Sequence, residues 1–577
     1  MKILGIHDGH NSSACLLIDG EIKYALQEER LTGEKNFYGF PERSIKKILE
    51  DFNLNPLEID KVVLSSQHMD SAPKSQKEWL EAFSRQSSFN FKNRLKGIIT
   101  KTDFWHQVAI KRKFPKRVAF LKKLGFSENQ IELIEHHLSH AASVYYGLAE
   151  TYNSSYLVLT LDGGGDGLSA TVNIGEKGKI KRIASTPDTH SLGNIYSRVT
   201  YLLGFTPWEH EYKLMGMAPY VPEQKTEKIA QIFKRYLTLD QQNPLIFKKL
   251  INENTQLIAD RLKRDLFRVR FDLICAGLQK FTEDLILQWV ENCIKETGIR
   301  RILCSGGVFM NVKTNQKILE LPEVEELKIM PSCGDETNSI GAAYLVYNRE
   351  KSRNNTLPES KSFGPIYFGN DISEREISKN LKKFKFPQQV KIEHYQDIEK
   401  KTAELLAKGE IIARAKGRME FGARALGNRS ILANPLEPKV VKIINEMIKS
   451  RDFWMPFAPS VLGERAEEYY IKPKTMQAPY MIITFDSRPE KRDKFIAACH
   501  PYDFTTRPQE VYKDWNPEYW KLLKYYESLT GEGIILNTSF NLHGFPIVSS
   551  AQQALDVFNH SGLKYLALGD YLIWKKE

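Results

Sequence analysis

Two stretches of the sequence repeat one pattern of strands and turns. Residues 4–23 (LGIHDGHNSSACLLIDGEIK) and residues 159–180 (LTLDGGGDGLSATVNIGEKGKI) each run from an apolar strand through an Asp-Gly turn into a second strand, a glycine turn and a third strand. Each stretch then leads into segments with a helical pattern. A unit of this kind that is used twice predicts two related α/β lobes.

A third segment favours lobes that close on a nucleotide. Residues 301–320 (RILCSGGVFMNVKTNQKILE) read as a strand, a turn at Gly306 and Gly307, and a helix that begins near Asn311. Glycine lets the backbone approach a ligand closely and a helix N-terminus favours an anion, so these three residues are candidate nucleotide contacts. Most Gly-Gly pairs are plain turns, but another strand–turn–helix follows this one at 326–347. Together the segments resemble the duplicated actin-like and sugar-kinase-like (RNase H-like) α/β architecture.

The segment 350–362 (EKSRNNTLPESKS) has the composition of a linker, because it is polar and shows no apolar periodicity. It predicts a first domain at residues 1–350, a linker at 351–362 and a second domain at 363–577. In the second domain, helical patterns near 396–408 and 437–450 alternate with apolar strands at 411–415, 480–485 and 533–538. We therefore expect a second α/β domain.

Two histidines in the segment 135–148 (EHHLSHAASVYYGL) stand one helical turn apart. His136 and His140 would share one face of that helix and could share a metal ion, although two histidines that cap or pack are the commoner case. Asp162 at the end of an apolar strand and Asp335 in a strand-end turn favour a metal, because strand ends converge in a two-lobed fold. Two imidazoles and two carboxylates suit iron(II), manganese or zinc better than magnesium.

Four loops of the second domain carry basic and amide side chains next to strand ends. Arginine can bind a phosphate through two hydrogen bonds and lysine acts as a point charge, so the loops predict a pocket for a mononucleotide and a phosphate. Any one of these residues alone is more often a member of a surface ion pair. The candidate residues are Arg424, Lys449, Arg507, Asn537 and Ser539.

The net charge of +11 is concentrated in residues 92–123 and 234–270, where Lys and Arg alternate with apolar residues at helical spacing. Solvated helix faces explain this pattern better than a nucleic-acid surface does. The apolar run at the start of the sequence is interrupted by His7, Asp8 and His10, whereas a signal peptide needs an uninterrupted apolar stretch. No apolar run approaches the roughly 20 residues that span a bilayer. We expect a cytoplasmic protein with no membrane contact.

The motifs, taken together, resemble O-carbamoyltransferases of the NodU/CmcH type, which act in the biosynthesis of antibiotics, toxins and nodulation factors. The resemblance covers nearly the whole chain in family order. It rests on LGIHDGHNSSACLL, EHHLSHAAS, LDGGGDG, EYKLMGMAPY, CSGGVFMN, SCGDE, GARALGNRSIL, PFAPSV, TTRPQ and NTSFN.

The resemblance implies a division of labour between the domains. A C-terminal YrdC-like domain would join carbamoyl phosphate to ATP, with Mg, and give carbamoyl-adenylate and pyrophosphate. The N-terminal domain would hold a metal, usually iron(II), and transfer the carbamoyl group to a hydroxyl of a small natural-product acceptor, with release of AMP. In this similarity the metal ligands are His136, His140, Asp162 and Asp335.

The same similarity assigns roles in binding and catalysis. Carbamoyl phosphate and the adenylate phosphate would be bound by Arg424, Lys449, Arg507, Asn537 and Ser539, with Arg424 and Lys449 also counted as catalytic. His10 lies where the family has a histidine after the first strand, and imidazole suits a general base near neutral pH. A homodimer is common for such enzymes.

The sequence departs from the family pattern in three places. Ala423 replaces a proline and Met455 replaces an arginine, and neither change removes an expected phosphate ligand. Bulky residues follow Asp335 where the family is rich in glycine and alanine, and their size would reshape the nucleotide cleft near Gly306, Gly307 and Asn311. Two alternatives stay open: a tRNA threonylcarbamoyladenosine-type enzyme, which the basic stretches do not exclude, and a non-enzymatic nucleotide switch of actin fold.

Overall fold

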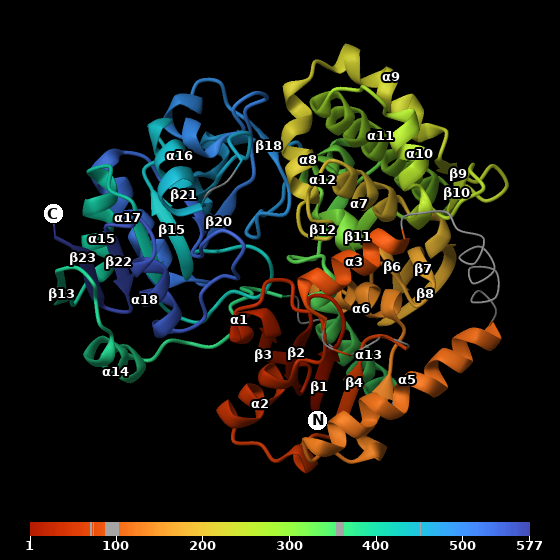
Figure 1. The fold of residues 1–577 in the computed structure, drawn as a ribbon, viewed down its shortest axis with the longest axis horizontal. Helices are drawn as coiled ribbons and strands as arrows, with labels where there is room; N and C mark the ends of the chain where they lie inside the picture. The colour runs from red at the N-terminus through yellow and green to blue at the C-terminus, as the bar shows by residue number, and fades with distance from the viewer. Residues whose placement is uncertain are drawn as a thin grey trace. The chain divides into compact units, whose positions relative to one another are not determined.

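The computed structural model describes the chain except for residues 68, 70–71, 73, 87–102, 354–362, 450–451 and 577. It divides into two compact units (Figure 1). The N-terminal unit comprises Met1–Thr32 and Asn36–Phe363, and the C-terminal unit comprises Gly364–Glu577 with Gly33–Lys35. Most of the expected linker, residues 354–362, lies outside the described residues, as does part of the basic stretch 92–123.

The first sheet of the N-terminal unit has the strand order β3-β2-β1-β4-β5. The first three strands form an antiparallel meander, and β4 and β5 extend the sheet in parallel with β1. The strands are β1 (Lys2–His7), β2 (Ser13–Ile18), β3 (Glu21–Gln27), β4 (Lys61–Leu64) and β5 (Ile131–Leu133).

The second sheet repeats this topology, with the order β8-β7-β6-β11-β12. Here too three antiparallel strands are extended by two parallel ones. Its strands are β6 (Tyr156–Gly165), β7 (Leu168–Glu176), β8 (Lys179–Pro187), β11 (Arg301–Ser305) and β12 (Glu326–Ile329). The predicted α/β class is confirmed, and the repeated sequence pattern corresponds to a repeated sheet.

Two helices connect the sheets crosswise. Helix α6 (His136–Leu148) follows the last strand of the first sheet but packs on β6, β7 and β11 of the second. Helix α13 (Asn338–Arg353) follows the second sheet and packs on β1, β2 and β4 of the first. The two helices also pack on each other so closely that a Cβ at Gly341 would lie 1.8 Å from the carbonyl oxygen of Ser139. This crossing places the N-terminal ends of both helices beside the strand ends.

The N-terminal unit contains further α-helices. They are α1 (Glu28–Thr32), α2 (Glu42–Asp51), α3 (Gln76–Gln86), α5 (Asp103–Lys123), α7 (Leu192–Leu202), α8 (Glu211–Met217), α9 (Glu223–Lys234), α10 (Ala259–Asp265), α11 (Phe271–Thr297) and α12 (Val312–Glu320).

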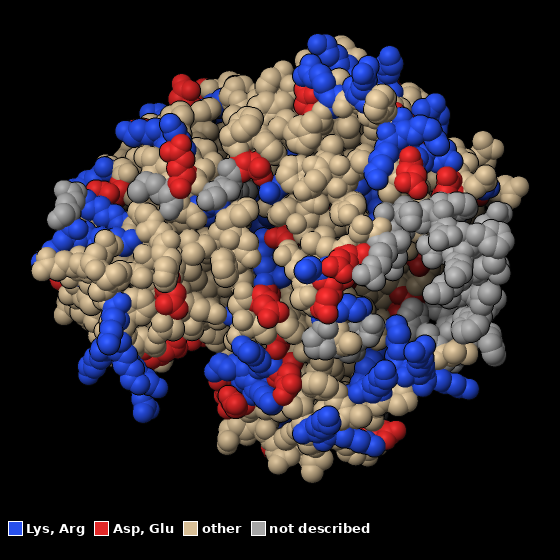
Figure 2. All heavy atoms as spheres, in the orientation of Figure 1, with Lys and Arg blue, Asp and Glu red and all other residues tan. Residues whose placement is uncertain are grey.

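Lys and Arg gather over α9 and α10, within the basic stretch 234–270 and just before it (Figure 2). Several of them are in ion pairs: Lys234 lies 2.9 Å from Asp284, and Arg261 lies 2.9 Å from Glu253. These contacts fit the reading of solvated helix faces. None of the described helices is long and apolar enough to cross a bilayer.

The C-terminal unit is built on an eight-stranded mixed sheet of order β13-β23-β22-β14-β15-β21-β16-β20. Its central strands are apolar on both faces: Ile412 and Ile535 pack into one core, and the next residues, Ala413 and Leu536, pack into the other. The strands are β13 (Val390–His394), β14 (Ile412–Ala415), β15 (Arg429–Ala433), β16 (Ala458–Leu462), β20 (Gln509–Val511), β21 (Ile534–Ser539), β22 (Tyr565–Leu568) and β23 (Tyr571–Lys575).

Helices cover both faces of this sheet: α14 (Glu374–Lys383), α15 (Ile398–Ala407), α16 (Lys439–Ile444), α17 (Pro517–Thr530) and α18 (Ala551–Asn559). The strand expected at 480–485 is wrong. Met481 has a φ of +55°, which an extended strand does not allow, and only β18 (Phe485–Ser487) is a strand there. Its apolar residues Ile482 and Ile483 are buried in an irregular segment instead.

Candidate metal centre and the second-unit loops

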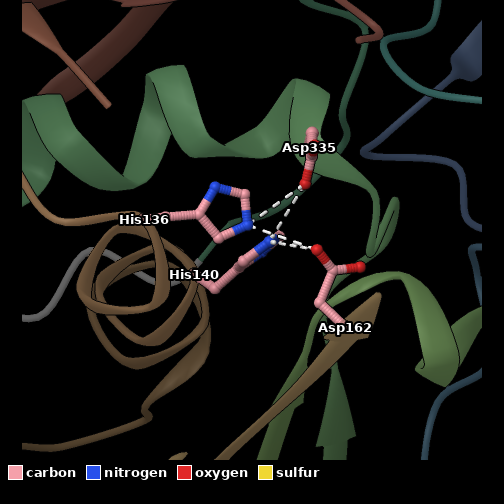
Figure 3. A group of neighbouring side chains, drawn as sticks. All are labelled: His136, His140, Asp162 and Asp335. Atoms are coloured by element: carbon pink, nitrogen blue, oxygen red, sulfur yellow. Dashed lines mark hydrogen bonds and ion pairs between the residues drawn. The ribbon is translucent and has the colours of Figure 1, made fainter. Parts of the chain in front are cut away.

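Four side chains from three places in the N-terminal unit point at one spot (Figure 3). His136 and His140 come from successive turns of α6, Asp162 comes from β6, and Asp335 begins the short 3₁₀ helix η7 (Asp335–Thr337) ahead of α13. Their nearest ligand-type atoms all lie within 4.8 Å of one another. The structure therefore brings together the four residues that the sequence named as metal ligands.

Both histidines direct the same ring nitrogen, Nε2, toward the two carboxylates. His136 Nε2 lies 3.2 Å from Asp162 Oδ2 and 3.4 Å from Asp335 Oδ1. His140 Nε2 lies 3.3 Å from Asp335 Oδ1 and 4.0 Å from Asp162 Oδ2. Two nitrogens and two carboxylate oxygens face one another across a space that an ion could share.

The electrostatics of the cluster are those of four buried groups in close contact. Burial alone lowers the pKa of His136, but Asp335 and Asp162 outweigh it and raise this pKa to about 10. Burial, with the neighbouring His136, lowers the pKa of His140 to about 3. Burial and the charge of Asp162 raise the pKa of Asp335, whereas the pKa of Asp162 is lowered because the contacts with His136 and His140 outweigh its burial.

The chemistry of the donor set fits a divalent transition ion. The buried Oδ1 of Asp335 makes no hydrogen bond within the described part of the chain, although it lies close to both imidazoles. Such an unsatisfied buried oxygen is costly unless something binds it. Two imidazoles with two carboxylates suit iron(II), manganese or zinc. An ion of this kind would be held by His136, His140, Asp162 and Asp335.

Neighbouring residues hold the cluster in place. Ser305 at the end of β11 lies 3.3 Å from Nδ1 of His140, which directs Nε2 of the same ring into the cluster. The amide of Asn338 lies 3.1 Å from that Nε2. His7 lies 3.7 Å from Asp335 Oδ2 and donates to the carbonyl oxygen of His10. His137 lies outside the cluster: its Nδ1 lies 2.8 Å from Thr160 Oγ1.

The Gly-Gly turn lies beside this cluster. The backbone N–H of Gly307 donates to Asp162 Oδ1 at 3.1 Å, so the turn orients a carboxylate of the cluster. Gly306 has a φ of +107°, and a Cβ there would lie 2.4 Å from the carbonyl oxygen of Leu161, so only glycine fits. Asn311 caps α12 through Thr314 N–H and exchanges hydrogen bonds with Gln279. Their expected nucleotide contacts stay a prediction.

His10 lies in a nest of aromatic rings near the cluster. Its ring packs edge-on against Trp79 and Trp208, with ring centroids 6.1 Å and 5.3 Å away. Burial lowers the pKa of His10 against the pull of Asp335, so the imidazole is neutral near pH 7. Its buried Nε2 has no hydrogen-bond partner among the residues that the structure describes. A neutral imidazole with a free nitrogen can accept a proton.

In the C-terminal unit the predicted loops also meet. The Lys449 ammonium is buried and donates to the carbonyl and hydroxyl oxygens of Ser539 and to Asn541 Oδ1, the last at 2.6 Å. Asn537, two residues before Ser539 on β21, donates to the carbonyl oxygen of Ala425 at 3.2 Å. It also donates to Gln509 at 3.1 Å. Lys449 thus contacts Ser539. Asn537 contacts Ala425, the residue after Arg424, and Gln509, two residues after Arg507.

Sequence reasoning missed several residues that the structure adds to the site. Ser305, Asn338 and His7 contact the cluster, and Glu135 and Asp166 bind the first turn of α6. Asp166 had a signal in the sequence, since it is the second aspartate of LDGGGDG. The others follow no spacing rule, because they reach the site from separate elements.

Two family models cover most of the chain. The model described as "Carbamoyltransferase N-terminus" matches residues 2–344, and "Carbamoyltransferase C-terminus" matches residues 403–575. The chain belongs to the carbamoyltransferase family. The predicted family and enzyme class are therefore confirmed, and the His/Asp cluster lies within the matched N-terminal part.

Two relatives illustrate the spread of the carbamoyltransferase family. An uncharacterized protein of Methanocaldococcus jannaschii is 32% identical, over 99% of this chain and 99% of its own length. Nodulation protein NolNO of Sinorhizobium fredii is 31% identical, over 98% of this chain and 79% of its own.

Solved structures give a weaker likeness. A dehydratase activator from Clostridium difficile with bound ADPNP matches with a TM-score of 0.30 and 13% identity, over 63% of this chain and 100% of that one. A likeness this weak supports no conclusion about function.

Proposed function

We propose that this carbamoyltransferase is an ATP-dependent O-carbamoyltransferase with a small hydroxylated natural product as acceptor. The observation that carries the proposal is the cluster of His136, His140, Asp162 and Asp335, whose ligand atoms lie within 4.8 Å of one another in the N-terminal unit. Family membership supports the carbamoyl group as the group that is transferred. The acceptor class rests on the resemblance to natural-product carbamoyltransferases.

The activation step is assigned to the C-terminal unit. There ATP and carbamoyl phosphate would give carbamoyl-adenylate, with pyrophosphate and inorganic phosphate released and one water consumed. Buried Lys449, held by Ser539 and Asn541, places a fixed positive charge for a phosphate. Arg424 and Arg507 would add bidentate hydrogen bonds to a phosphate. Asn537 links the loops that carry these arginines, because it donates hydrogen bonds to Ala425 and Gln509.

The transfer step is assigned to the N-terminal unit. The acceptor hydroxyl would attack the carbamoyl carbon, the bond to the adenylate oxygen would break, and AMP would leave. His10 would take the hydroxyl proton on Nε2, which its neutral state allows. The four cluster residues would hold an ion, iron(II) before manganese or zinc, whose Lewis acidity favours negative charge on the carbamoyl oxygen. Gly307 N–H keeps Asp162 oriented at 3.1 Å.

One assay tests the activation chemistry without knowledge of the acceptor. The enzyme is incubated with MgATP, labelled pyrophosphate and carbamoyl phosphate, and the label that enters ATP is measured. We expect exchange that depends on carbamoyl phosphate. Exchange without carbamoyl phosphate, or no exchange at all, would contradict the assignment of the C-terminal unit. A nucleotide switch would bind ATP and give no exchange.

A further inference from the structure

We propose that Asp166 and Glu135 are positioning residues that make the first turn of α6 able to accept a cation. Asp166 fixes the backbone of His136 and adds negative charge at the positive end of the helix, while Glu135, which is ion-paired with Arg182, caps the next two N–H groups. The inference deepens the proposed function and rests on its metal centre, but not on the carbamoyl chemistry.

A helix N-terminus is an unfavourable place for a cation. The first backbone N–H groups have no partner within the helix, and the aligned peptide dipoles give that end about half a positive charge. His136 is the first residue of α6 and His140 lies one turn later, so the cluster sits at this end. An ion bound there needs compensating negative charge beyond that of Asp162 and Asp335.

Two carboxylates occupy the first turn of α6. Asp166 Oδ2 accepts the N–H of His136 at 2.9 Å. Glu135 accepts the N–H of His137 at 2.9 Å and that of Leu138 at 2.8 Å. The first three N–H groups of the helix therefore all have carboxylate acceptors where the two imidazoles project. Glu135 is also ion-paired with Arg182, which reduces its share in offsetting the dipole.

Asp166 also ties His136 to a second strand end. Its carboxylate accepts from Ser66 Oγ at 2.8 Å and from Gln67 N–H at 2.8 Å, both just beyond β4. Asp166 thus joins the β6–β7 turn, the end of β4 and the start of α6. Asp162 lies four residues earlier, within β6, so one short segment carries a cluster carboxylate and the anchor for a cluster histidine.

This anchor matters more for His136 than a similar one would for His140. The Nδ1 of His140 has Ser305 as a neighbour at 3.3 Å, whereas the buried Nδ1 of His136 has no hydrogen-bond partner among the described residues. The position of the His136 ring therefore depends on its backbone and on packing. The backbone and the packing of His136 are both set by the end of β6 and by Asp166, which follows it.

The test measures binding of Co²⁺, as a stand-in for iron(II), to the full-length metal-free protein by calorimetry and by the visible spectrum of the bound ion. Asp166→Asn keeps the size of the side chain and one carbonyl-type acceptor but removes the charge. We expect it to bind Co²⁺ about 10- to 100-fold more weakly, with an altered spectrum. Glu135→Gln is expected to weaken binding as well.

A matched control is available in the same unit. Glu28 is a buried carboxylate that accepts the N–H groups of Arg43 and Ser44 in the first turn of α2, at 2.8 Å and 2.7 Å. Glu28→Gln removes the same kind of helix-end charge outside the cluster. It should leave the Co²⁺ affinity and spectrum unchanged.

The outcomes are separable. If Asp166→Asn binds Co²⁺ as the unmodified protein does, or if Glu28→Gln weakens binding equally, the inference is overturned. Should Asp166→Asn not fold, Ser66→Ala removes one of the bonds to the same carboxylate and should weaken binding severalfold; an unchanged affinity overturns the inference too. If the unmodified protein binds no Co²⁺, iron(II), manganese or zinc, the metal centre of the proposed function fails with it, while pyrophosphate exchange still tests carbamoyl activation.

Discussion

His136 and His140 lie one turn apart on α6, yet their surroundings shift their pKa values in opposite directions. His136 lies within 3.4 Å of both Asp162 and Asp335, and these carboxylates raise its pKa to about 10. His140 is equally buried, but its pKa falls to about 3 because the charge of His136 adds to the cost of burial. Without an ion, the cluster therefore keeps a proton on His136, which holds the two carboxylates together.

That proton must leave when a metal binds. Because the pKa of His136 is about 10, the ring is charged at every pH below that value, and only the neutral imidazole is a ligand. Metal affinity should therefore rise with pH, by about tenfold per unit between pH 6 and 8. Calorimetry in buffers of different ionisation enthalpy should show about one proton released per ion. A proton count near zero would contradict this prediction.

The glycine that packs on His136 offers a steric test. A Cβ at Gly165 would lie 2.2 Å from Cγ of the His136 ring, so Gly165→Ala must displace the imidazole. We expect the substitution to cost about 1–3 kcal/mol of stability and to weaken metal binding. Gly163→Ala, two residues earlier on β6, is the control, because its Cβ would meet nothing closer than 3.8 Å. Thermal denaturation and metal titration measure both effects, and equal losses would exclude a steric cause.

The cluster was predictable from sequence because each of its members obeys a spacing or strand-end rule. His136 and His140 are four apart in a helical pattern, and Asp162 and Asp335 follow apolar strands. Asp166 and Glu135 were not predicted, since they act on backbone N–H groups, whose direction depends on where α6 begins. Ser305 reaches His140 because α6 packs on β11, and Asn338 reaches it from the first turn of α13; spacing in the sequence reports neither contact.

At the scale of elements, a buried ion pair joins α5 to the end of β1. Arg117 donates to both oxygens of Asp8, at 2.6 Å and 2.7 Å, and to the carbonyl oxygen of Ser66 at 2.7 Å. Both side chains are almost completely buried. Helix α5 is thereby fixed to the strand ends that flank the cluster.

Removal of one partner of this pair should be costly. Arg117→Leu leaves Asp8 charged and buried, so we expect a loss of about 3–5 kcal/mol in the stability of the N-terminal unit. The double variant Asp8→Asn with Arg117→Leu should recover part of the loss, because no unpaired charge remains. Urea denaturation followed by circular dichroism measures both. A double variant no more stable than the single one would argue against the ion pair as the cause.

The elements were predicted best where the apolar pattern and the backbone agree. The strand at 533–538 and the helix at 135–148 correspond to β21 and α6 to within a residue. The strand expected at 480–485 failed because Met481 has a positive φ, which side-chain pattern does not report. The helix expected at 437–450 ends as an α-helix at Ile444 and continues as a π-helical turn to Lys449.

For the whole molecule, the proposed function assigns one half-reaction to each unit. Lys449→Ala should lower carbamoyl-phosphate-dependent pyrophosphate exchange by about 100-fold or more, because a fixed charge beside the phosphates is lost. Lys442→Ala is the matched control, since this lysine lies in α16 and its side chain is 76% exposed. Its exchange rate should be unchanged.

His136→Ala should show the reverse behaviour. We expect exchange to be retained and the bound metal, measured by mass spectrometry, to be lost, because His136 is part of the cluster and not of the C-terminal loops. If His136→Ala and Lys449→Ala lose exchange to the same extent, the two half-reactions are not divided between the units.

The repeated sheet topology also allows equivalent positions of the two sheets to be compared. Asp8 and Asp162 stand at similar places in the repeat, each in an Asp-Gly pair: Asp8 directly follows β1, and Asp162 lies near the end of β6. Arg117 neutralises the first, whereas His136 and His140 face the second. Matching positions of a repeated framework thus differ in use: Asp8 anchors a helix, whereas Asp162 faces two imidazoles.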